Sequence, residues 1–344
     1  MALRVGFIGA GANTRLWHIP QLAAQEGVEL AAVVNRSRES SQRIVDEFGI
    51  PRVHDSVAEL LADTSLDAVC IGTWPYMHRE YTVAALNAGK HVLCEARMAM
   101  NAAEAEEMLA ASRANPSLVA QLVPAPFDFR LGPTIMRRLR DGTLGEVTEA
   151  TIAVLNGAGL DPAAPLHWRH RTDYSGRNVM MLGIYAEIVL RWLGETARVM
   201  ADGAIVVPER LDPESGEIRA VDVPDTFSVL ARMRSGVRVT YHLSSVTAGA
   251  PFNGIVVHGT KATLQWRPND RATITPHGGA AEELEPDQGT DRGWRVEHDF
   301  VDSIRNGAPV TLTNFPDGVR YMRFIDACWR SWQEGKAMEV APLG

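Results

Sequence analysis

Short apolar strands alternate with helices through the first third of the chain, and this alternation restricts the fold more than any other feature. Strand-like runs lie at residues 3–8, 28–34, 67–71, 91–94 and 118–122, and a helical stretch follows each of the first four. Runs this short and apolar are typical of strands buried on both faces, and intervening helices are typical of parallel βαβ units. The pattern therefore predicts an α/β fold with a doubly wound parallel sheet.

The pattern changes after Pro124. Longer strands now predominate, at 148–155, 198–207, 226–234, 237–245, 254–258, 262–265 and 272–275. Ser235-Gly236 and Gly259-Thr260 predict hairpin turns, so these strands are expected to pair mostly antiparallel, with a helix at 178–193 in the same region. The 344 residues fit two domains, which we place at 1–123 and 124–344.

The composition excludes several classes of partner. The net charge is −8 and the pI is about 5.7, so neither nucleic acid nor an anionic membrane is an expected partner. Three widely spaced cysteines form no disulfide framework and no CxxC metal pattern, which is typical of a protein in the reducing cytoplasm. No apolar run reaches the ~18 residues of a membrane span, and no signal peptide is recognisable. We expect a small-molecule ligand and no metal.

Glycines interrupt the first strand and open a helix, as Gly9-Ala10-Gly11. In dinucleotide-binding turns such glycines allow a tight turn and close approach of the backbone to a diphosphate, and the helix N-terminus donates N–H groups to it. The third glycine of the usual fingerprint is replaced by Thr14. We predict that the cofactor contacts Gly9, Gly11, Ala12, Asn13, Thr14 and Arg15.

The end of the second strand distinguishes NAD from NADP. A carboxylate there usually binds the ribose 2′-hydroxyl of NAD. This chain has Asn35-Arg36-Ser37-Arg38 instead, with Ser37 as the expected N-cap of the next helix. Two guanidinium groups and a hydroxyl suit a 2′-phosphate, and Arg36 is able to stack on adenine. We therefore predict NADP as the cofactor, with NAD as the alternative.

A series of further motifs points to one family. They are His18-Ile19-Pro20, Ile71-Gly72-Thr73-Trp74-Pro75-Tyr76-Met77-His78, Ala88-Gly89-Lys90-His91-Val92-Leu93-Cys94-Glu95, Trp168-Arg169, Gly183-Ile184-Tyr185 and Asp299-Phe300-Val301. Together with the glycine turn, they resemble the Gfo/Idh/MocA family (glucose–fructose oxidoreductase, inositol dehydrogenase, rhizopine catabolism) over nearly the full length. The resemblance implies an N-terminal Rossmann domain and a C-terminal α/β domain. The latter carries a large, mostly antiparallel sheet, open on one face, which commonly forms homodimers or homotetramers.

The chain departs from this family at a functional motif. The family usually reads Glu-Lys-Pro after the fourth strand, and its lysine assists hydride transfer, whereas this chain reads Glu95-Ala96-Arg97. The only lysines are Lys90, Lys261 and Lys336, and none is expected near this turn. Arg97 stays protonated at any relevant pH, so it can stabilise an alkoxide but cannot relay a proton.

The resemblance also suggests which other residues form the site. It implies that Thr73, Trp74 and His78 lie near the nicotinamide or its ribose, with Glu95 and Arg169 also in the cofactor site. We interpret His18 as a structural residue.

Candidate catalytic groups come from the second domain. Tyr185 stands where the family usually has histidine, as it does in some relatives, and Arg97 or Arg169 is the expected cation that would lower its pKa. His167 or His170 is a candidate proton relay, because the reference pKa of histidine lies near neutrality. Asp173 is expected to orient one of these two rings.

These residues predict an NAD(P)-dependent oxidoreductase. The expected substrate is a sugar-like or cyclic alcohol, at which a ring hydroxyl or carbonyl gives or takes a hydride, without the usual family lysine. Two alternatives remain open at this point. One is a redox-neutral, NAD-dependent bond cleavage of the glycosidase type, with the histidine-rich segment supplying bases. The other is a non-catalytic NAD(P)-binding regulator. The lysine of the Glu-Lys-Pro motif is missing, and so is the aspartate of the family's Asp-x-Gly-x-His motif, where this chain has Met181.

Overall fold

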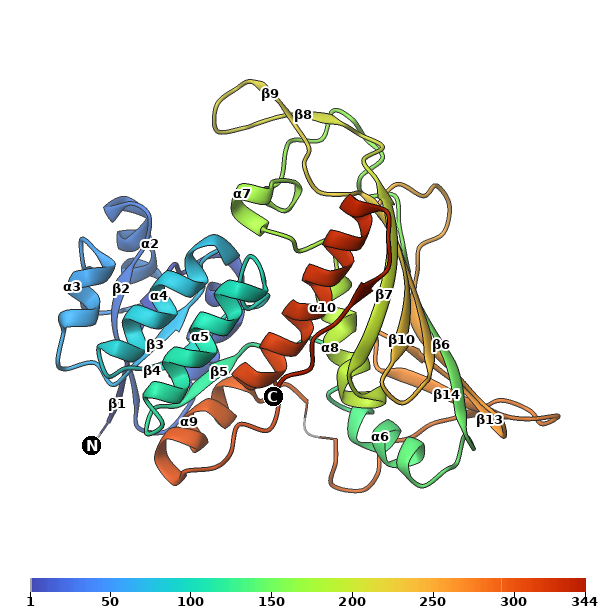
Figure 1. Cartoon of the computed structure of the whole chain (residues 1–344). Helices are drawn as coiled ribbons and strands as arrows, with labels where there is room; N and C mark the ends of the chain where they lie inside the picture. The colour runs from blue at the N-terminus through green and yellow to red at the C-terminus, as the bar shows by residue number, and fades with distance from the viewer. Residues whose placement is uncertain (1, 292) are drawn as a thin grey trace. The chain divides into compact units, whose positions relative to one another are not determined.

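The computed structural model describes residues 2–291 and 293–344, and they form two compact units (Figure 1). One unit is Met1–Pro124 with Arg295–Val319, and the other is Ala125–Trp294 with Arg320–Gly344. The first division falls beside the predicted boundary at 123/124. Residues 295–319 were predicted for the second domain, and this assignment is wrong. They belong to the first unit because Gln121 donates to the Val296 carbonyl at 3.0 Å and the Leu122 N–H to the Thr313 carbonyl at 3.1 Å.

The first unit contains the predicted doubly wound parallel sheet. Its strands are β1 (Leu3–Ile8), β2 (Val28–Val34), β3 (Ala68–Ile71), β4 (His91–Cys94) and β5 (Ala120–Leu122). They lie in the order β2-β1-β3-β4-β5, and every neighbouring pair is parallel. The chain order reverses between β1 and β3. In sheets of this kind, ligands bind outside the carboxyl ends of the strands at such a reversal.

Helices connect and cover these strands. They are η1 (Thr14–His18), α1 (Ile19–Ala23), α2 (Arg38–Phe48), α3 (Val57–Ala62), α4 (Pro75–Asn87), α5 (Ala102–Ala114) and α9 (Val296–Asn306). Figure 1 shows α4 and α5 side by side over the strands, and the two helices are in contact. Ser37 caps α2 as predicted. The short helix α3, which begins at the cap residue Ser56, was not predicted.

The second unit is built on a nine-stranded sheet in the order β15-β14-β13-β12-β6-β11-β10-β7-β16. Its strands are β6 (Val147–Leu155), β7 (Thr196–Ala204), β10 (Thr226–Met233), β11 (Arg238–Ser244), β12 (Phe252–Gly259), β13 (Ala262–Arg267), β14 (Arg271–Pro276), β15 (Glu282–Glu283) and β16 (Met338–Glu339). The sheet is mostly antiparallel, as predicted, with β6 and β11 as its parallel pair. Both predicted hairpin turns join antiparallel neighbours.

Helices pack against one face of this sheet. They include α8 (Leu182–Leu193) and α10 (Phe315–Glu334), while α6 (Gly132–Arg140) contacts α8. Trp192 of α8 stacks edge-on against Trp266 at 5.8 Å, and Phe324 of α10 lies 5.3 Å from Tyr241. On alternate positions of the strands the side chains are exposed, among them Met200 at 41% and Leu230 at 63%. The sheet is therefore open on its other face.

No helix in the described part of the chain is both long enough and apolar enough to cross a membrane.

Candidate cofactor and substrate site

The turn after β1 contains two glycines with different structural requirements. Gly9 has φ +77°, which L side chains rarely adopt, and a Cβ there would lie 2.5 Å from Cγ2 of Thr73. At Gly11 a Cβ would lie 3.6 Å from its nearest neighbour, the Gly72 carbonyl oxygen, which is an ordinary contact. The fold therefore requires glycine at position 9 but leaves room at position 11. Close approach of a diphosphate to the backbone would account for glycine at this second position.

Two buried hydroxyls beside this turn have no hydrogen-bond partner within residues 2–291 and 293–344, namely Oγ1 of Thr14 and Oγ1 of Thr73. Thr14 lies against Gly72, where a Cβ would come within 1.9 Å of its Oγ1, and Thr73 lies against Gly9. An unsatisfied buried hydroxyl costs about 1–3 kcal/mol, and phosphate or ribose oxygens would supply the missing partner. The residues present therefore fit a dinucleotide.

The helix after the turn begins with a π-helical segment, η1, before α1 continues to Ala23. Gly11, Ala12 and Asn13 are exposed, so their backbone is accessible to a ligand. Arg15 is also exposed, but its guanidinium pairs with Glu47 of α2 at 2.7 Å. Arg15 therefore reaches toward α2, and only its N–H, which donates to the Gly11 carbonyl, takes part in the turn.

The end of β2 holds the glycine turn in place. Asn35 accepts the Ala10 N–H through Oδ1 at 2.6 Å, and its own amide donates to a carbonyl of α2. Arg38 forms an ion pair with Asp55 in which both side chains are largely exposed. Exposed pairs of this kind contribute little free energy, so the pair does not prevent Arg38 from binding an anion. No carboxylate stands at Asn35, Arg36 or Ser37.

The turn after β4 carries Glu95-Ala96-Arg97, with a cis peptide bond between Ala96 and Arg97. The Arg97 Nη1 atom is buried and has no hydrogen-bond partner in the part of the chain that the structure describes. The Glu95 carboxylate, by contrast, is bound by His18 Nε2 at 3.0 Å and by the Ala96 N–H at 3.0 Å. Of the residues predicted here, Arg97 therefore has hydrogen-bonding capacity left for a ligand, whereas the protein already engages both oxygens of Glu95.

The lysines lie elsewhere. Lys90 precedes β4, and its Nζ donates to the carbonyls of Asp63 and Leu66 at 2.8 and 2.7 Å, before β3 begins. Lys261 lies between β12 and β13, and Lys336 pairs with Glu334 at 2.8 Å. Because parallel strands share their carboxyl ends, Lys90 is at the edge of the sheet opposite to the Arg97 turn, as predicted.

His78 of α4 lies between the turn after β3 and the turn after β4. Its Nδ1 lies 2.9 Å from the Arg97 carbonyl oxygen and its Nε2 lies 2.9 Å from the Thr73 carbonyl oxygen. Burial lowers the pKa of His78, although both backbone contacts act in the opposite direction. The sequence predicted that His78 contacts the cofactor. Instead, both ring nitrogens face backbone carbonyls, and the neutral ring donates its one N–H to one of the two, after β3 or after β4.

Tyr185 of α8 is fully buried, and its hydroxyl donates to Oδ1 of Asn253 on β12. Its ring packs against Phe127, with centroids 6.1 Å apart. Burial raises the pKa of Tyr185, and the Asn253 bond offsets this only partly. The expected lowering of this pKa by an arginine is therefore wrong, because the phenol has a neutral amide as its partner. Tyr185 therefore stays protonated at neutral pH, so it cannot accept a proton, and its raised pKa makes it a weaker acid than a free phenol.

The segment with His167 and His170 forms the short helices η2 (Trp168–His170) and α7 (Thr172–Ser175). Nδ1 of His167 accepts the Arg169 N–H, and Nδ1 of His170 accepts the His167 N–H, both at 3.2 Å. Burial and the nearby Arg169 lower the pKa of His167 to about 4, and burial also lowers that of His170. Both rings are therefore neutral, with their proton on Nε2. This arrangement does not suit the proton-accepting role that the sequence suggested, but it does suit hydrogen-bond donation.

Asp173 does not orient either histidine. Its carboxylate forms a two-pronged pair with Arg171, at 2.9 and 2.5 Å, and Arg171 lies over the Tyr174 ring at 4.1 Å. The expectation for Asp173 is therefore wrong. The charged guanidinium of Arg171, two residues away, binds the Asp173 carboxylate more strongly than a neutral imidazole would. Arg169 stacks on Trp168 at 4.2 Å.

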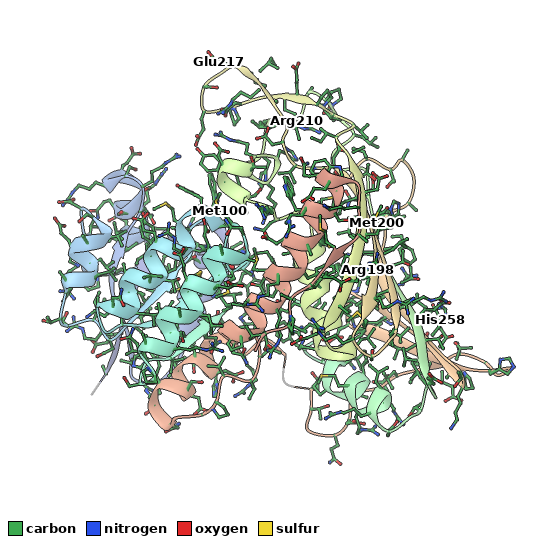
Figure 2. All side chains as sticks on the ribbon, in the orientation of Figure 1. Met100, Arg198, Met200, Arg210, Glu217 and His258 are labelled. Atoms are coloured by element: carbon green, nitrogen blue, oxygen red, sulfur yellow. The ribbon has the colours of Figure 1, made fainter. Side chains whose placement is uncertain are left out.

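A hairpin of β8 (Glu209–Leu211) and β9 (Ile218–Ala220), which the sequence analysis missed, holds this region. Figure 2 labels Arg210 on the hairpin and Glu217 next to β9. Arg210 is 3% exposed and donates to the carbonyls of Gly159, Asp161 and Ala164. No local pattern marks this pair of three-residue strands.

Two other partners of site residues were missed, Asn253 and Glu297. Asn253 is 68 positions from its partner Tyr185, and Glu297 is 279 positions from its partner His18. Neither residue belongs to a motif. Within the described residues, no group of three or more His, Cys, Asp or Glu side chains is arranged to hold a metal ion.

Comparison with known proteins identifies the two units. Residues 3–121 match the family described as "Oxidoreductase family, NAD-binding Rossmann fold" (GFO_IDH_MocA). Residues 134–265 match the "GFO/IDH/MocA C-terminal domain". The two matches together cover most of the chain.

Individual relatives have related activities. The chain is 30% identical to 1,5-anhydro-D-fructose reductase of Ensifer adhaerens, over 76% of this chain and 74% of that protein. It is 29% identical to trans-1,2-dihydrobenzene-1,2-diol dehydrogenase of Mus musculus, over 78% of this chain and 77% of that protein. The structure of levoglucosan dehydrogenase with NADH and L-sorbose has the same fold, with a TM-score of 0.86 at 21% identity over the full length of both chains.

The two glycines give a matched pair of variants. Gly11→Ala should leave the unfolding temperature nearly unchanged, because a Cβ fits there, but should weaken nicotinamide cofactor binding by at least about tenfold. Gly9→Ala should destabilise the fold by roughly 1–3 kcal/mol, because of its positive φ and the contact with Thr73. Thermal unfolding and calorimetric cofactor titration measure both effects. Unchanged affinity in a folded Gly11→Ala protein would place the cofactor away from this turn.

Proposed function

Because the chain belongs to the Gfo/Idh/MocA family of NAD(P)-dependent oxidoreductases, we propose that it moves a hydride to or from a ring carbon of a sugar-like or cyclic alcohol substrate. The observation that supports this most is the glycine turn at the reversal of strand order, where Thr14 and Thr73 keep buried hydroxyls without partners. The names of the two relatives also support the substrate class. An anhydrofructose and a dihydrobenzene diol are both rings with oxygen functions at ring carbons.

We further propose NADP as the preferred cofactor. A carboxylate at the end of β2 would repel a 2′-phosphate, and Asn35 stands there instead. Arg36 and Arg38 flank the capping residue Ser37, and together they supply positive charge where a 2′-phosphate would lie.

Arg97 is the proposed replacement for the family lysine. Its Nη1 is buried and lacks a partner among the residues that the structure describes, although a buried charge without one is costly. A substrate oxygen that gains negative charge during hydride transfer would satisfy this nitrogen. A permanently charged donor preorganised in this way stabilises such an oxygen electrostatically. Arg97 thus supplies charge stabilisation, and the proton has to come from another group.

Tyr185 is the proposed proton donor. When bound, a nicotinamide gives or takes the hydride, and the protein must handle the hydroxyl proton. Burial keeps the Tyr185 phenol protonated and makes it a weak acid, so it would give its proton only to a strong base such as the alkoxide that forms when a carbonyl is reduced. The Nε2–H groups of His167 and His170 and the guanidinium of Arg169 are proposed to bind substrate or cofactor oxygens.

The observations do not favour the two alternative functions. Redox-neutral bond cleavage needs a base for an α-proton, and Nδ1 of both His167 and His170 is occupied by a backbone N–H. A regulator without catalysis would not need the unpartnered nitrogen of Arg97.

We also propose that the chain forms a homodimer through the open face of the nine-stranded sheet. Met200 and Leu230 are exposed there beside Arg198, Arg232 and Arg238, and Glu149 lies in the same groove. Figure 2 labels Arg198 and Met200 on β7. Apolar side chains in a groove with both signs of charge suit a second copy of the same surface, because a two-fold interface must be self-complementary.

The proposed function is tested by turnover. We expect the protein to oxidise NADPH more efficiently than NADH when it is supplied with cyclic ketones or ketoses. The amount of NADPH oxidised, measured by absorbance, should equal the amount of product formed. A panel of sugars, anhydrosugars and cyclic diols with NADP+ tests the reverse direction. Product formation without net cofactor oxidation would instead indicate redox-neutral chemistry, and cofactor binding without turnover of any compound would contradict the proposal.

Replacing Arg97 separates charge stabilisation from cofactor binding. Arg97→Gln should lower kcat by about 10²–10³-fold, the usual cost of losing one preorganised donor to an oxyanion, with cofactor affinity nearly unchanged. Arg97→Lys should restore part of the rate because it restores the charge. Arg79→Gln is the control, since Arg79 is an exposed arginine of the same unit that pairs with Glu107. Equal rates for Arg97→Gln and the control would exclude Arg97 from the reaction.

The dimer is tested at Leu230. Leu230→Glu should convert the protein to a monomer in sedimentation experiments, because it replaces an exposed apolar side chain of the groove by a carboxylate. Leu211→Glu, at a similarly exposed leucine of the β8–β9 hairpin, is the control and should leave the dimer intact. A wild-type protein that sediments as a monomer would contradict the proposed interface.

A further inference from the structure

A histidine lies between two carboxylates inside the first unit. Nδ1 of His18 is 2.5 Å from Oε1 of Glu297, and its Nε2 is 3.0 Å from Oε1 of Glu95. All three side chains are buried, and none is more than 8% exposed. His18 closes η1, Glu95 follows β4, and Glu297 is in the first turn of α9, so the cluster joins three separate segments.

The ring is positively charged at neutral pH. Burial alone lowers the pKa of His18, but the hydrogen bonds and the attraction of Glu297 and Glu95 outweigh it and raise the pKa to about 9. Burial raises the pKa of Glu95, and the bond and charge of His18 more than compensate, so the pKa of Glu95 is lowered. His18 therefore donates through both nitrogens, one to each carboxylate.

This cluster contacts the turn that bears Arg97. The second oxygen of Glu95, Oε2, accepts the Ala96 N–H at 3.0 Å, so the carboxylate is bound on one side by His18 and on the other by the turn itself. On the far side of the same turn, the Arg97 carbonyl lies 2.9 Å from His78 Nδ1. The backbone that carries Arg97, whose Nη1 has no partner among the described residues, thus has the Glu95 carboxylate at one end and the His78 ring at the other.

We propose that His18, clamped by Glu297, is a positioning residue that fixes the Glu95-Ala96-Arg97 turn and thereby aims the Arg97 guanidinium at the reacting oxygen. The part of this inference that concerns Arg97 rests on the proposed function. The part that concerns the turn does not. A helix near the end of the chain, α9, then contributes to the active turn through Glu297.

The other titratable groups that face this cluster are Cys70, Cys94 and His78. Burial raises the pKa of both thiols and lowers that of His78, so all three are neutral between neutral pH and about pH 9. Deprotonation of His18 is therefore the event that loosens the turn in alkaline solution. Because its folded pKa is raised, the stabilisation is complete below the reference pKa of 6.5 and is lost as the pH rises through about 9.

Hydrogen exchange of the Ala96 amide measures the turn without requiring activity. In His18→Gln and in Glu297→Gln, the exchange of a peptide covering Ala96 should accelerate by about tenfold, while peptides from β1 stay protected. His54→Gln is the matched control, a partly buried histidine of the same unit beside Asp63. In the wild type, exchange corrected for its intrinsic pH dependence should accelerate with a midpoint near pH 9.

Kinetics supply the second readout. His18→Gln should lower kcat by a larger factor than it changes the KM for cofactor. In an Arg97→Gln background it should lower kcat no further, because both substitutions remove the same contribution of Arg97 to the rate. Unchanged Ala96 exchange in folded His18→Gln and Glu297→Gln, and in wild type through pH 9, would overturn the proposal. If Ala96 exchange accelerates in the variants but the wild type turns over no substrate, the role of His18 in positioning the turn is supported and the proposed function is contradicted. If His18→Gln does not fold, Glu297→Gln and the wild-type pH series decide.

Discussion

The close approach of two backbone turns, at the point where the order of parallel strands reverses, determines how the first unit is built. Gly9 follows β1 and Thr73 follows β3, and they pack so tightly that a Cβ on Gly9 would overlap the threonine side chain. This contact brings Thr14, Gly72 and the exposed backbone at Gly11 to one edge of the sheet. Gly11, Ala12 and Asn13 are exposed at that edge, whereas the hydroxyls of Thr14 and Thr73 are buried.

Histidines and carboxylates then fix the next turn along. His78 has one ring nitrogen 2.9 Å from the Thr73 carbonyl, after β3, and the other 2.9 Å from the Arg97 carbonyl, after β4, while His18, itself bound by Glu297, donates to Glu95. Within the described residues, Nη1 of Arg97 is a charged nitrogen of this turn without a partner, one residue after the position where this family usually has lysine. An arginine beside that position supplies charge, as a lysine would, but does not exchange protons. We propose that the chemistry is divided, with charge stabilisation by Arg97 and proton donation by Tyr185.

Much of the fold could be predicted, because its signals are local. Apolar runs of four to seven residues indicated the parallel strands, and the Gly9-Ala10-Gly11 turn fell where a tight connection was needed. The position of residues 295–319 could not be predicted, because it depends on contacts such as that of Gln121 with Val296, 175 positions apart. The same holds for the site. Motifs located Tyr185 and His170. Burial raises the pKa of Tyr185, and the backbone N–H of His167 occupies Nδ1 of His170, and no local sequence pattern predicts either effect.

The most direct test of the central claim, that the Gly9–Thr14 turn binds a nicotinamide dinucleotide, is a crystal structure of the protein soaked with NADP+. We predict that the diphosphate lies against the Gly11 backbone, with Thr14 or Thr73 hydroxyls bonded to the cofactor and the 2′-phosphate bound by Arg36 or Arg38. Electron density for the dinucleotide at another place, or a turn that stays empty at a concentration that saturates related enzymes, would contradict the account.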